Sequence, residues 1–382
     1  MAAARSLAER GVTRLRWLAL VGRRSFARDF GADGRGAGRP VGRRPLARLG
    51  SVAGAGALCI VGACGERELV VREFGGRSMG TSYAVTCIAS ADVERAELER
   101  AVAAELAAVT ARASTWDATS ELARFNAARS TAPFAASNEL SELVARSVSF
   151  AHLTGGAFDP TVLPLVRALG FAADGGAGEV DEAGLSAARD HVGVAKLRVE
   201  RGSLAKLDPE LELDLSGIAP GDAVDRLGAT LDALGARAWL VELGGEVRAH
   251  GTKLDGSPWL VGIEVPREGS DFGDELLRRV ELSERALATS GSYRRARAAG
   301  AQRVHHVVDP RTGRNPSHDT VSVTVLAPTC ARADALATAL LVMGADEGLR
   351  WLETQSDVEA LFVRADGERF EVRATPNFPT ES

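Results

Sequence analysis

Alternating apolar residues divide much of the chain into short predicted strands. Residues 68–90 contain two apolar and β-branched runs, at 69–71 and 83–88, which predict a pair of strands. The glycine-rich stretch between them, 75–81, predicts the connecting turn. Comparable runs predict further strands at 196–200, 211–215, 238–242, 259–265, 304–308 and 320–327.

Apolar residues at helical spacing predict the helices. In the stretch 91–112 these residues are Val93, Leu98, Val102, Leu106 and Val109. A second helix is predicted at 138–152 with Ser137 as its N-cap, and others at 221–235, 331–354 and the end of 172–190. Because strands and helices alternate without a regular βαβ rhythm, we expect an α+β fold, with antiparallel sheets and packed helices in one compact mixed domain over 65–382.

The N-terminal residues 1–64 have the features of an export signal. Residues 49–63 form an uncharged run that is short for a transmembrane helix but suits the core of a signal peptide. The pair Arg43-Arg44 precedes the run and resembles a Tat signal. The run ends at Cys64 in a sequence, VGAC, that resembles a bacterial lipobox. We therefore predict a lipidated Cys64 and an exported protein anchored to the cell membrane on its periplasmic or extracytoplasmic face; the alternative is a marginal buried helix with a chance cysteine.

Charge is distributed unevenly along the chain. Residues 1–64 carry a net charge of +9 and the whole chain −5, so that residues 65–382 carry −14. An acidic domain argues against nucleic acid as a partner. The domain also contains only Cys87 and Cys330, too few for a zinc site or a disulfide framework.

Several polar motifs have both a chemical and a structural interpretation. Residues 154–161 place two glycines before Phe158 and Asp159. Phe158 could lie against a flat ring and Asp159 could accept hydrogen bonds from that ring's N–H groups. The alternative is that Gly155 caps the preceding helix and a turn follows. Residues 213–225 lead from a predicted strand into a helix whose N-terminus suits a phosphate, or form a plain connection. His306 could transfer a proton or be structural.

Asp334 and Thr338 are four residues apart near the start of a predicted helix and therefore share one face. Their hard oxygen atoms suit Mg²⁺ with phosphate and water completing the shell. The alternative is a solvated Asp and a Thr that bonds to its own helix backbone.

Taken together, the motifs resemble those of the ApbE family of FAD:protein FMN transferases, in the family's order, from about Phe74 to Gly344. They are, in order, Met79-Gly80-Thr81, Ser114-Thr115-Trp116-Asp117, Ser120-Glu121, Arg124-Phe125-Asn126, Gly155-Gly156-Ala157-Phe158-Asp159-Pro160, Asp214-Leu215-Ser216-Gly217-Ile218-Ala219, Leu243-Gly244-Gly245-Glu246, Thr289-Ser290-Gly291-Ser292-Tyr293, His306-Val307-Val308-Asp309-Pro310 and Ala333-Asp334-Ala335.

The resemblance implies roles for individual residues. It implies FAD contacts at Met79, Ala157, Phe158, Asp159, Asp214 and Val308. It implies an Mg²⁺ site at Gly217, Asp334, Ala337 and Thr338, and catalytic roles for His306 and Asp334. The implied reaction transfers FMN from FAD to a Ser or Thr hydroxyl of a partner and releases AMP. The implied acceptor is a periplasmic flavoprotein or an FMN-bearing subunit of an Rnf-like or Na⁺-translocating redox complex.

The sequence departs from the family pattern at three positions. Pro220 stands where the family usually has Lys or Glu, Asp222 where it has Tyr, and Glu242 where Asn is common. Pro supplies neither a charge nor a backbone N–H. Two alternatives therefore remain beside the transferase: a lipoprotein that binds or hydrolyses FAD, and a degenerate paralogue without catalysis.

Overall fold

The computed structural model describes residues 68–172, 180–267, 269, 275–293, 296–299, 302–367 and 369–379. The predicted signal segment and Cys64 lie outside these residues. No helix within the described ranges is long and apolar enough to cross a membrane.

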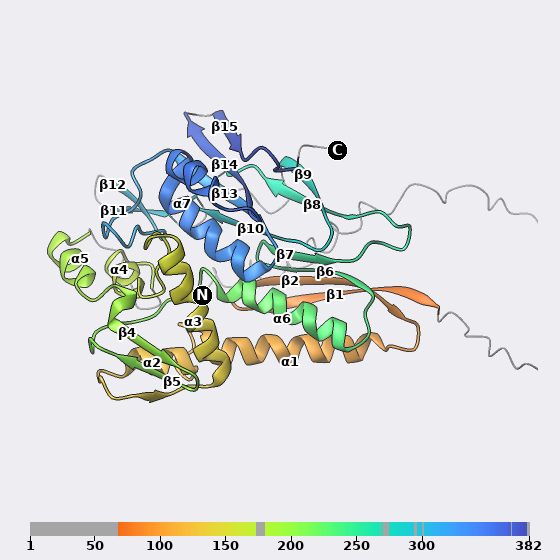
Figure 1. The fold of residues 1–382 in the computed structure, drawn as a ribbon, viewed down its shortest axis with the longest axis horizontal. Coiled ribbons are helices and arrows are strands. Elements are labelled where there is room, and N and C mark those ends of the chain that lie inside the picture. Colours follow the sequence, from red (N-terminus) through yellow and green to blue (C-terminus); the bar gives the residue numbers. More distant parts are fainter. Residues whose placement is uncertain are drawn as a thin grey trace, which may run out of the picture. The chain divides into compact units, whose positions relative to one another are not determined.

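The centre of the fold is an antiparallel sheet of eight strands (Figure 1). Its strands lie in the order β1-β2-β6-β7-β10-β13-β14-β15, and each neighbouring pair is antiparallel. Their bounds are Leu69–Ser78, Thr81–Ser90, Ala238–Leu243, Glu246–His250, Ala286–Gly291, Thr320–Ala327, Glu359–Asp366 and Arg369–Ala374.

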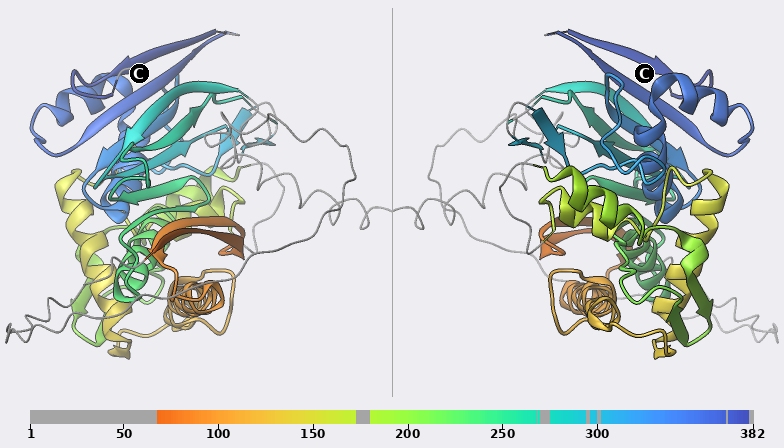
Figure 2. Two further views of the ribbon diagram at one scale, coloured as in Figure 1. Left: turned by 90° about the vertical axis from the view of Figure 1, so that its right-hand side faces the viewer. Right: turned by 90° about the vertical axis from the view of Figure 1, so that its left-hand side faces the viewer.

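Three helices pack against this sheet: α1 (Arg95–Ala113), α6 (Ala219–Ala233) and α7 (Cys330–Leu352). Neighbouring helices contact one another, α1 with α6 and α6 with α7. Figure 2 shows α1 beside the curled β1–β2 hairpin. The apolar stripe that predicted α1 is buried, because Leu98, Val102, Leu106 and Val109 all belong to the main core.

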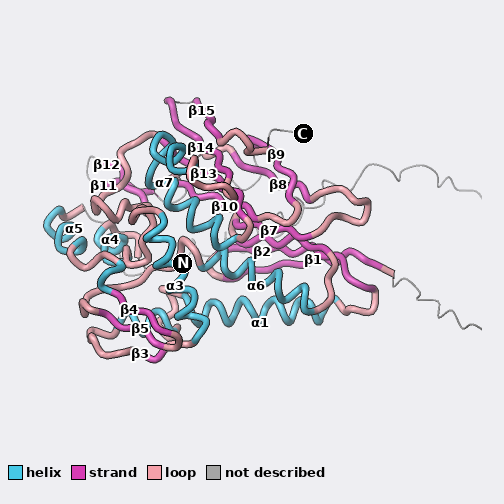
Figure 3. The backbone as a smooth tube through the Cα atoms, viewed as in Figure 1, coloured by secondary structure: helices cyan, strands magenta, loops and turns pink. Residues whose placement is uncertain are grey.

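Smaller elements surround this layer, and Figure 3 distinguishes the helices from the strands among them. A three-stranded sheet of β3 (Phe134–Ala135), β5 (Ser203–Lys206) and β4 (Leu197–Glu200) adjoins α3 (Asn138–Leu153). The remaining elements are α2 (Glu121–Ala127), α4 (Leu163–Ala168), α5 (Glu182–Arg189), the 3₁₀ turn Val194–Lys196 and two hairpins, β8–β9 (Trp259–Glu264 and Leu276–Leu282) and β11–β12 (Ala296–Ala299 and Gln302–His305).

The α+β prediction is confirmed, and most predicted elements are found near their expected positions. Ser137 caps α3 as predicted, because its hydroxyl accepts a hydrogen bond from Leu140 N. Three predictions differ from the structure. Residues 211–215 form no strand, and the first turn is shorter than 75–81 because β1 continues to Ser78. The strand predicted at 304–308 ends at His305.

The turn between β1 and β2 consists of Met79 and Gly80 alone. Both residues have positive φ, 48° and 76°. A two-residue turn of this hand matches the right-handed twist of the strands that it joins. Met79 is therefore held at the tip of a tight hairpin, although a side chain disfavours this backbone conformation.

Lys206 at the end of β5 is a buried cation, with 1% of its surface exposed. Its ammonium group donates to Asn126 O at 3.1 Å and to Ala128 O at 2.8 Å, at the C-terminal end of α2. It also lies 4.9 Å from the centre of the Phe125 ring. A cation is favourable at a helix C-terminus. Burial nevertheless lowers the pKa of Lys206 to about 8.

This lowered pKa predicts a stability that rises in alkaline solution. Between about pH 8 and the ordinary Lys pKa the unfolded chain binds more protons, so stability increases with pH across this window. Relative to Lys206→Met, the unmodified protein should gain about 1–3 kcal/mol of unfolding free energy from pH 7.5 to 10. Urea unfolding at both pH values measures the difference, and parallel pH curves for the two proteins would contradict the prediction.

Candidate active site

Several predicted motifs meet at one end of the large sheet. Register places Leu243 opposite both Tyr83 and Glu246, so the β1–β2 and β6–β7 turns are neighbours. Gly244 N donates to Ser82 O at 3.1 Å across this junction. Strand β10 follows β7 in the sheet, and its last residues, Ser290 and Gly291, lie toward the same end. Glycine-containing motifs that are far apart in the sequence therefore lie at the same end of the sheet.

The predicted metal residues are brought together where α7 crosses the turn before α6. A Cβ atom on Gly217 would lie 3.0 Å from Thr338 Oγ1 and 3.3 Å from Phe158 Cε2. Three residues from separate motifs therefore lie in close contact, and a side chain at position 217 would not fit without displacing its neighbours. Ser290 joins them, because its hydroxyl lies 3.2 Å from that of Thr338. The resemblance named the Ser290 motif but gave this serine no role.

Asp334 lies one turn before Thr338 on α7 and is 4% exposed. Its Oδ2 accepts a hydrogen bond from Gly221 N at 3.0 Å, in the first turn of α6. Burial raises the pKa of this carboxyl to about 7; the bond from Gly221 opposes the shift and the charge of Asp225 adds to it. A buried carboxylate is costly without a cation or several donors.

Asp225 holds the N-terminus of α7 against α6. Its two carboxylate oxygens accept from Cys330 N and Ala331 N, each at 2.9 Å, and Oδ1 also pairs with Arg248 at 2.7 Å. These bonds satisfy free N–H groups of the first helical turn. The direction in which α7 presents Asp334 and Thr338 is therefore set from α6.

These side chains suit a hard cation. Among the described residues, no three acidic, His or Cys side chains cluster as a metal-binding group. Asp334 would thus supply the carboxylate, with Thr338 supplying a hydroxyl oxygen and Gly217 and Ala337 backbone carbonyls. Because Mg²⁺ retains several waters or phosphate oxygens, one carboxylate with neutral oxygens is an adequate protein contribution.

Four of the six predicted flavin residues, Ala157, Phe158, Asp159 and Asp214, form a second group beside the first, whereas Met79 lies in the β1–β2 turn and Val308 packs with α4 and α5. Asp214 N donates to Pro160 O at 2.7 Å, so Asp214 adjoins the Ala157–Asp159 turn. Asp159 is held by Thr161, whose backbone N–H and hydroxyl donate to Oδ1 at 2.8 and 2.6 Å. Burial raises the pKa of Asp159, and these bonds oppose the shift. Phe158 is 4% exposed and packs edge-on against Phe150, so little of its ring faces solvent.

His306 and Val308 lie on the loop between β12 and β13. Val308 is buried with residues of α4 and α5, and the His306 ring lies edge-on to Phe171. Arg311 anchors this loop, because it pairs with Asp309 at 3.0 Å and with Glu347 of α7 at 2.7 Å. Its Cγ also lies 3.7 Å from the Cβ position of Gly156. The loop is thereby tied both to α7 and to the turn that precedes Ala157.

The three departures from the family pattern each have a local structural role. Pro220 occupies the first turn of α6, where a missing N–H is tolerated. Asp222 is buried and pairs with Arg146 and Arg226. Glu242 accepts a hydrogen bond from Gly245 N at 2.9 Å and closes the β6–β7 turn.

Comparison with known proteins gives matches over most of the chain. The ApbE family model matches residues 79–362. The flavin transferase ApbE from Vibrio cholerae is 35% identical, with a TM-score of 0.72, over 82% of this chain and 99% of that one. The apo form of the Pseudomonas stutzeri flavinyl transferase ApbE is also 35% identical, with a TM-score of 0.73, over 81% and 95%. An FAD:protein FMN transferase from Haemophilus influenzae is 33% identical over 80% of this chain and 89% of its own.

The approach of α6 to α7 predicts the effect of adding one methyl group. A Cβ atom on Gly221 would lie 2.5 Å from Cys330 O and 2.9 Å from Ala331 Cα, so Gly221→Ala must push the helices apart. We expect a loss of about 1–3 kcal/mol of unfolding free energy, measured by urea denaturation. The control is Gly184→Ala in α5, where the nearest atoms to the added Cβ belong to the movable side chain of Asp181. Equal stability of the two variants would refute a close helix contact.

Proposed function

The chain belongs to the ApbE family and is a flavin transferase, and we propose that it moves FMN from FAD to a hydroxyl group of a partner protein with the help of Mg²⁺. In this reaction the Ser or Thr oxygen of the acceptor attacks the phosphorus of the FMN half. The pyrophosphate bond then breaks, and AMP leaves with the bridging oxygen. The hydroxyl proton passes to a base, for which His306 is the candidate. With water as the attacking group, the products are FMN and AMP.

One observation supports this proposal above the others: Phe158, Gly217 and Thr338 lie in close contact, one helical turn from the buried Asp334. A bound Mg²⁺ would neutralise the charge that develops on the phosphates. Asp334, Thr338 and the carbonyls of Gly217 and Ala337 would hold it. Asp214 and Asp159 would orient the flavin end through their acceptor oxygens, and Met79 and Val308 would pack against FAD. The pyrophosphate would then lie near the N-terminus of α6, where a helix favours anions.

We further propose that the protein works outside the cytoplasm while anchored by a lipid on Cys64. The acceptor would then be a periplasmic flavoprotein or an outward-facing FMN subunit of a membrane redox complex. The signal-like run before Cys64 supports this location.

Substitution of Asp334 tests the chemistry. Asp334→Asn retains the acceptor for Gly221 N but removes the charge, so Mg²⁺-dependent release of AMP from FAD should fall by about 100-fold or more. AMP is measured by chromatography, and flavin fluorescence of the acceptor band in a denaturing gel measures transfer. Asp346→Asn is the matched control, because this Asp lies on the same helix with 80% of its side chain exposed.

The remaining outcomes separate the alternatives. FAD binding without AMP release, with or without an acceptor, would identify a flavin-binding lipoprotein. AMP release without protein-bound flavin in the presence of acceptor would identify an FAD hydrolase. The absence of both binding and AMP release would identify a degenerate paralogue.

Substitution of Cys64 tests the anchor. The unmodified protein should incorporate labelled palmitate and enter the detergent phase of Triton X-114, whereas Cys64→Ser should do neither, because only a thiol at the lipobox accepts the lipid. Cys59→Ser is the matched control, since Cys59 lies in the same apolar run and should leave labelling unchanged. Labelling that survives Cys64→Ser would refute the anchor.

A further inference from the structure

The segment 211–215 carries Asp214, yet it pairs with no strand of the described sheets. Its alternating sequence, LELDL, predicted a strand, and Leu211, Leu213 and Leu215 are fully buried as they would be in one. Backbone N–H and C=O groups in a buried segment need partners. Those partners come from elsewhere in the chain.

The side chain of Asn126 supplies the bonds that a neighbouring strand would make. Its Nδ2 donates to Leu213 O, and its Oδ1 accepts from Leu213 N, both at 2.8 Å. A residue in an antiparallel ladder exchanges the same two bonds with its partner. Asn126 is 6% exposed and stands in the last turn of α2, where Lys206 fixes its own carbonyl.

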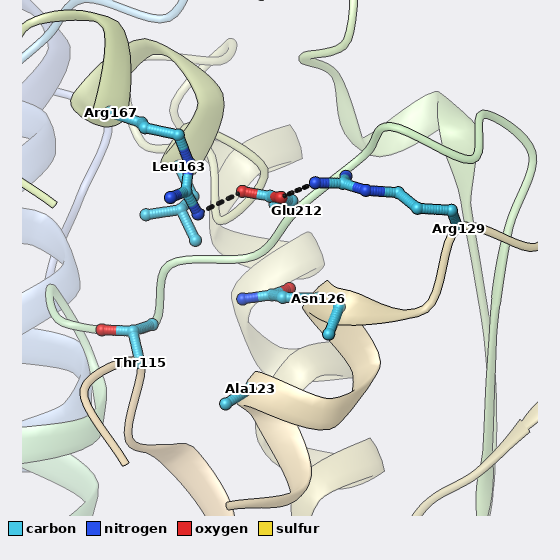
Figure 4. A pocket seen from close by; sticks show the side chains of 8 residues that line it. Thr115, Ala123, Asn126, Arg129, Leu163, Arg167 and Glu212 are labelled. Atoms are coloured by element: carbon cyan, nitrogen blue, oxygen red, sulfur yellow. Dashed lines mark hydrogen bonds and ion pairs between the residues drawn. The ribbon is translucent and has the colours of Figure 1, made fainter. Parts of the chain in front are cut away.

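Glu212 fastens the same segment from another direction. Its carboxylate is buried and bridges Arg129 at 2.7 Å and Arg167 at 2.9 Å (Figure 4). Together with Asn126, these side chains line a pocket of about 400 Å³. The charged pairs join α4 and the end of α2 to the segment, so that residues 212 and 213 are both held by side chains.

Asp214 is the next residue, and its position follows from these contacts. Its N–H donates to Pro160 O at 2.7 Å, which places it beside Asp159. Its carboxylate accepts from Ser216 N at 2.8 Å, in the turn that leads to Gly217. If the backbone of Leu213 moved, Asp214 would therefore move with it.

We infer that Asn126 is a positioning residue for substrate binding: it stands in for a missing strand and fixes the backbone from which Asp214 reaches FAD, with Glu212 as its second anchor. This inference rests on the proposed function, in which Asp214 contacts FAD. It assigns Asn126 no contact with the reacting atoms. Loss of Asn126 should therefore weaken FAD binding and leave the chemical step intact.

Asn126→Asp tests the inference, because it keeps the shape and the acceptor oxygen but removes the donor to Leu213 O. We expect KM for FAD to rise tenfold or more, and kcat at saturating FAD and Mg²⁺ to stay within about threefold of the unmodified enzyme. Amide hydrogen exchange should accelerate at residues 211–216. Glu212→Gln, which weakens the second anchor and retains its shape, should give a smaller change in the same direction and provides the test if Asn126→Asp does not fold.

Ser141→Ala is the matched control for a merely structural role. Ser141 is 1% exposed and also holds a loop by two hydrogen bonds, to Asn138 O and from Gly202 N, and neither bond involves the 211–215 segment. It should lower stability without changing KM. An unchanged KM in Asn126→Asp, or a loss confined to kcat, would overturn the inference.

The hydrogen-exchange measurement separates this inference from the proposed function. If the unmodified protein neither binds FAD nor releases AMP, the proposed function fails. Unchanged exchange at residues 211–216 in Asn126→Asp would overturn the positioning role by itself, whether or not the enzyme is active.

Discussion

The close contact between α6 and α7 is the constraint on which the rest of the site depends. At Gly221 the two backbones approach so closely that no side chain fits between them. The same residue donates its N–H to Asp334, and Asp225 one turn later binds the N-terminus of α7. Packing, capping and the placement of a candidate metal ligand thus depend on one crossing. A movement of either helix would change all three together, because interiors are packed too densely to absorb it.

Buried and half-buried carboxylates hold the elements around the site together, and their partners differ in kind. Asp225 pairs with one arginine and accepts two backbone N–H groups. Glu212 and Asp222 each pair with two arginines. Asp334 instead receives a backbone N–H, and its pKa is raised by burial to about 7. A bound cation would stabilise the charged form of a carboxylate in this environment. This contrast separates a candidate ligand from acids that hold helices and segments together.

The three residues that depart from the family pattern are each accommodated by local contacts or by their position in a helix. Asp222 replaces an aromatic residue, but its charge is satisfied by Arg146 and Arg226, which ties α6 to α3. Pro220 suits the first turn of a helix, and Glu242 closes a hairpin.

The sequence by itself determined the α+β class, most helices and the motifs, because apolar periodicity and glycine-rich turns are local properties of the chain. It predicted α1, α3 and the strand at 320–327, and the order of the motifs indicated the family. Tertiary structure decided which motifs meet: Gly217 with Thr338 and Phe158, Ser290 with Thr338, and Gly221 with Asp334. The tertiary structure also decided that Asn126 holds the strand-like segment 211–215. Alternation of apolar residues indicates which side chains are buried, but it does not show which groups bond to the backbone N–H and C=O. Such pairings join residues that are far apart in the chain, and a local sequence pattern cannot show that these residues are close in space.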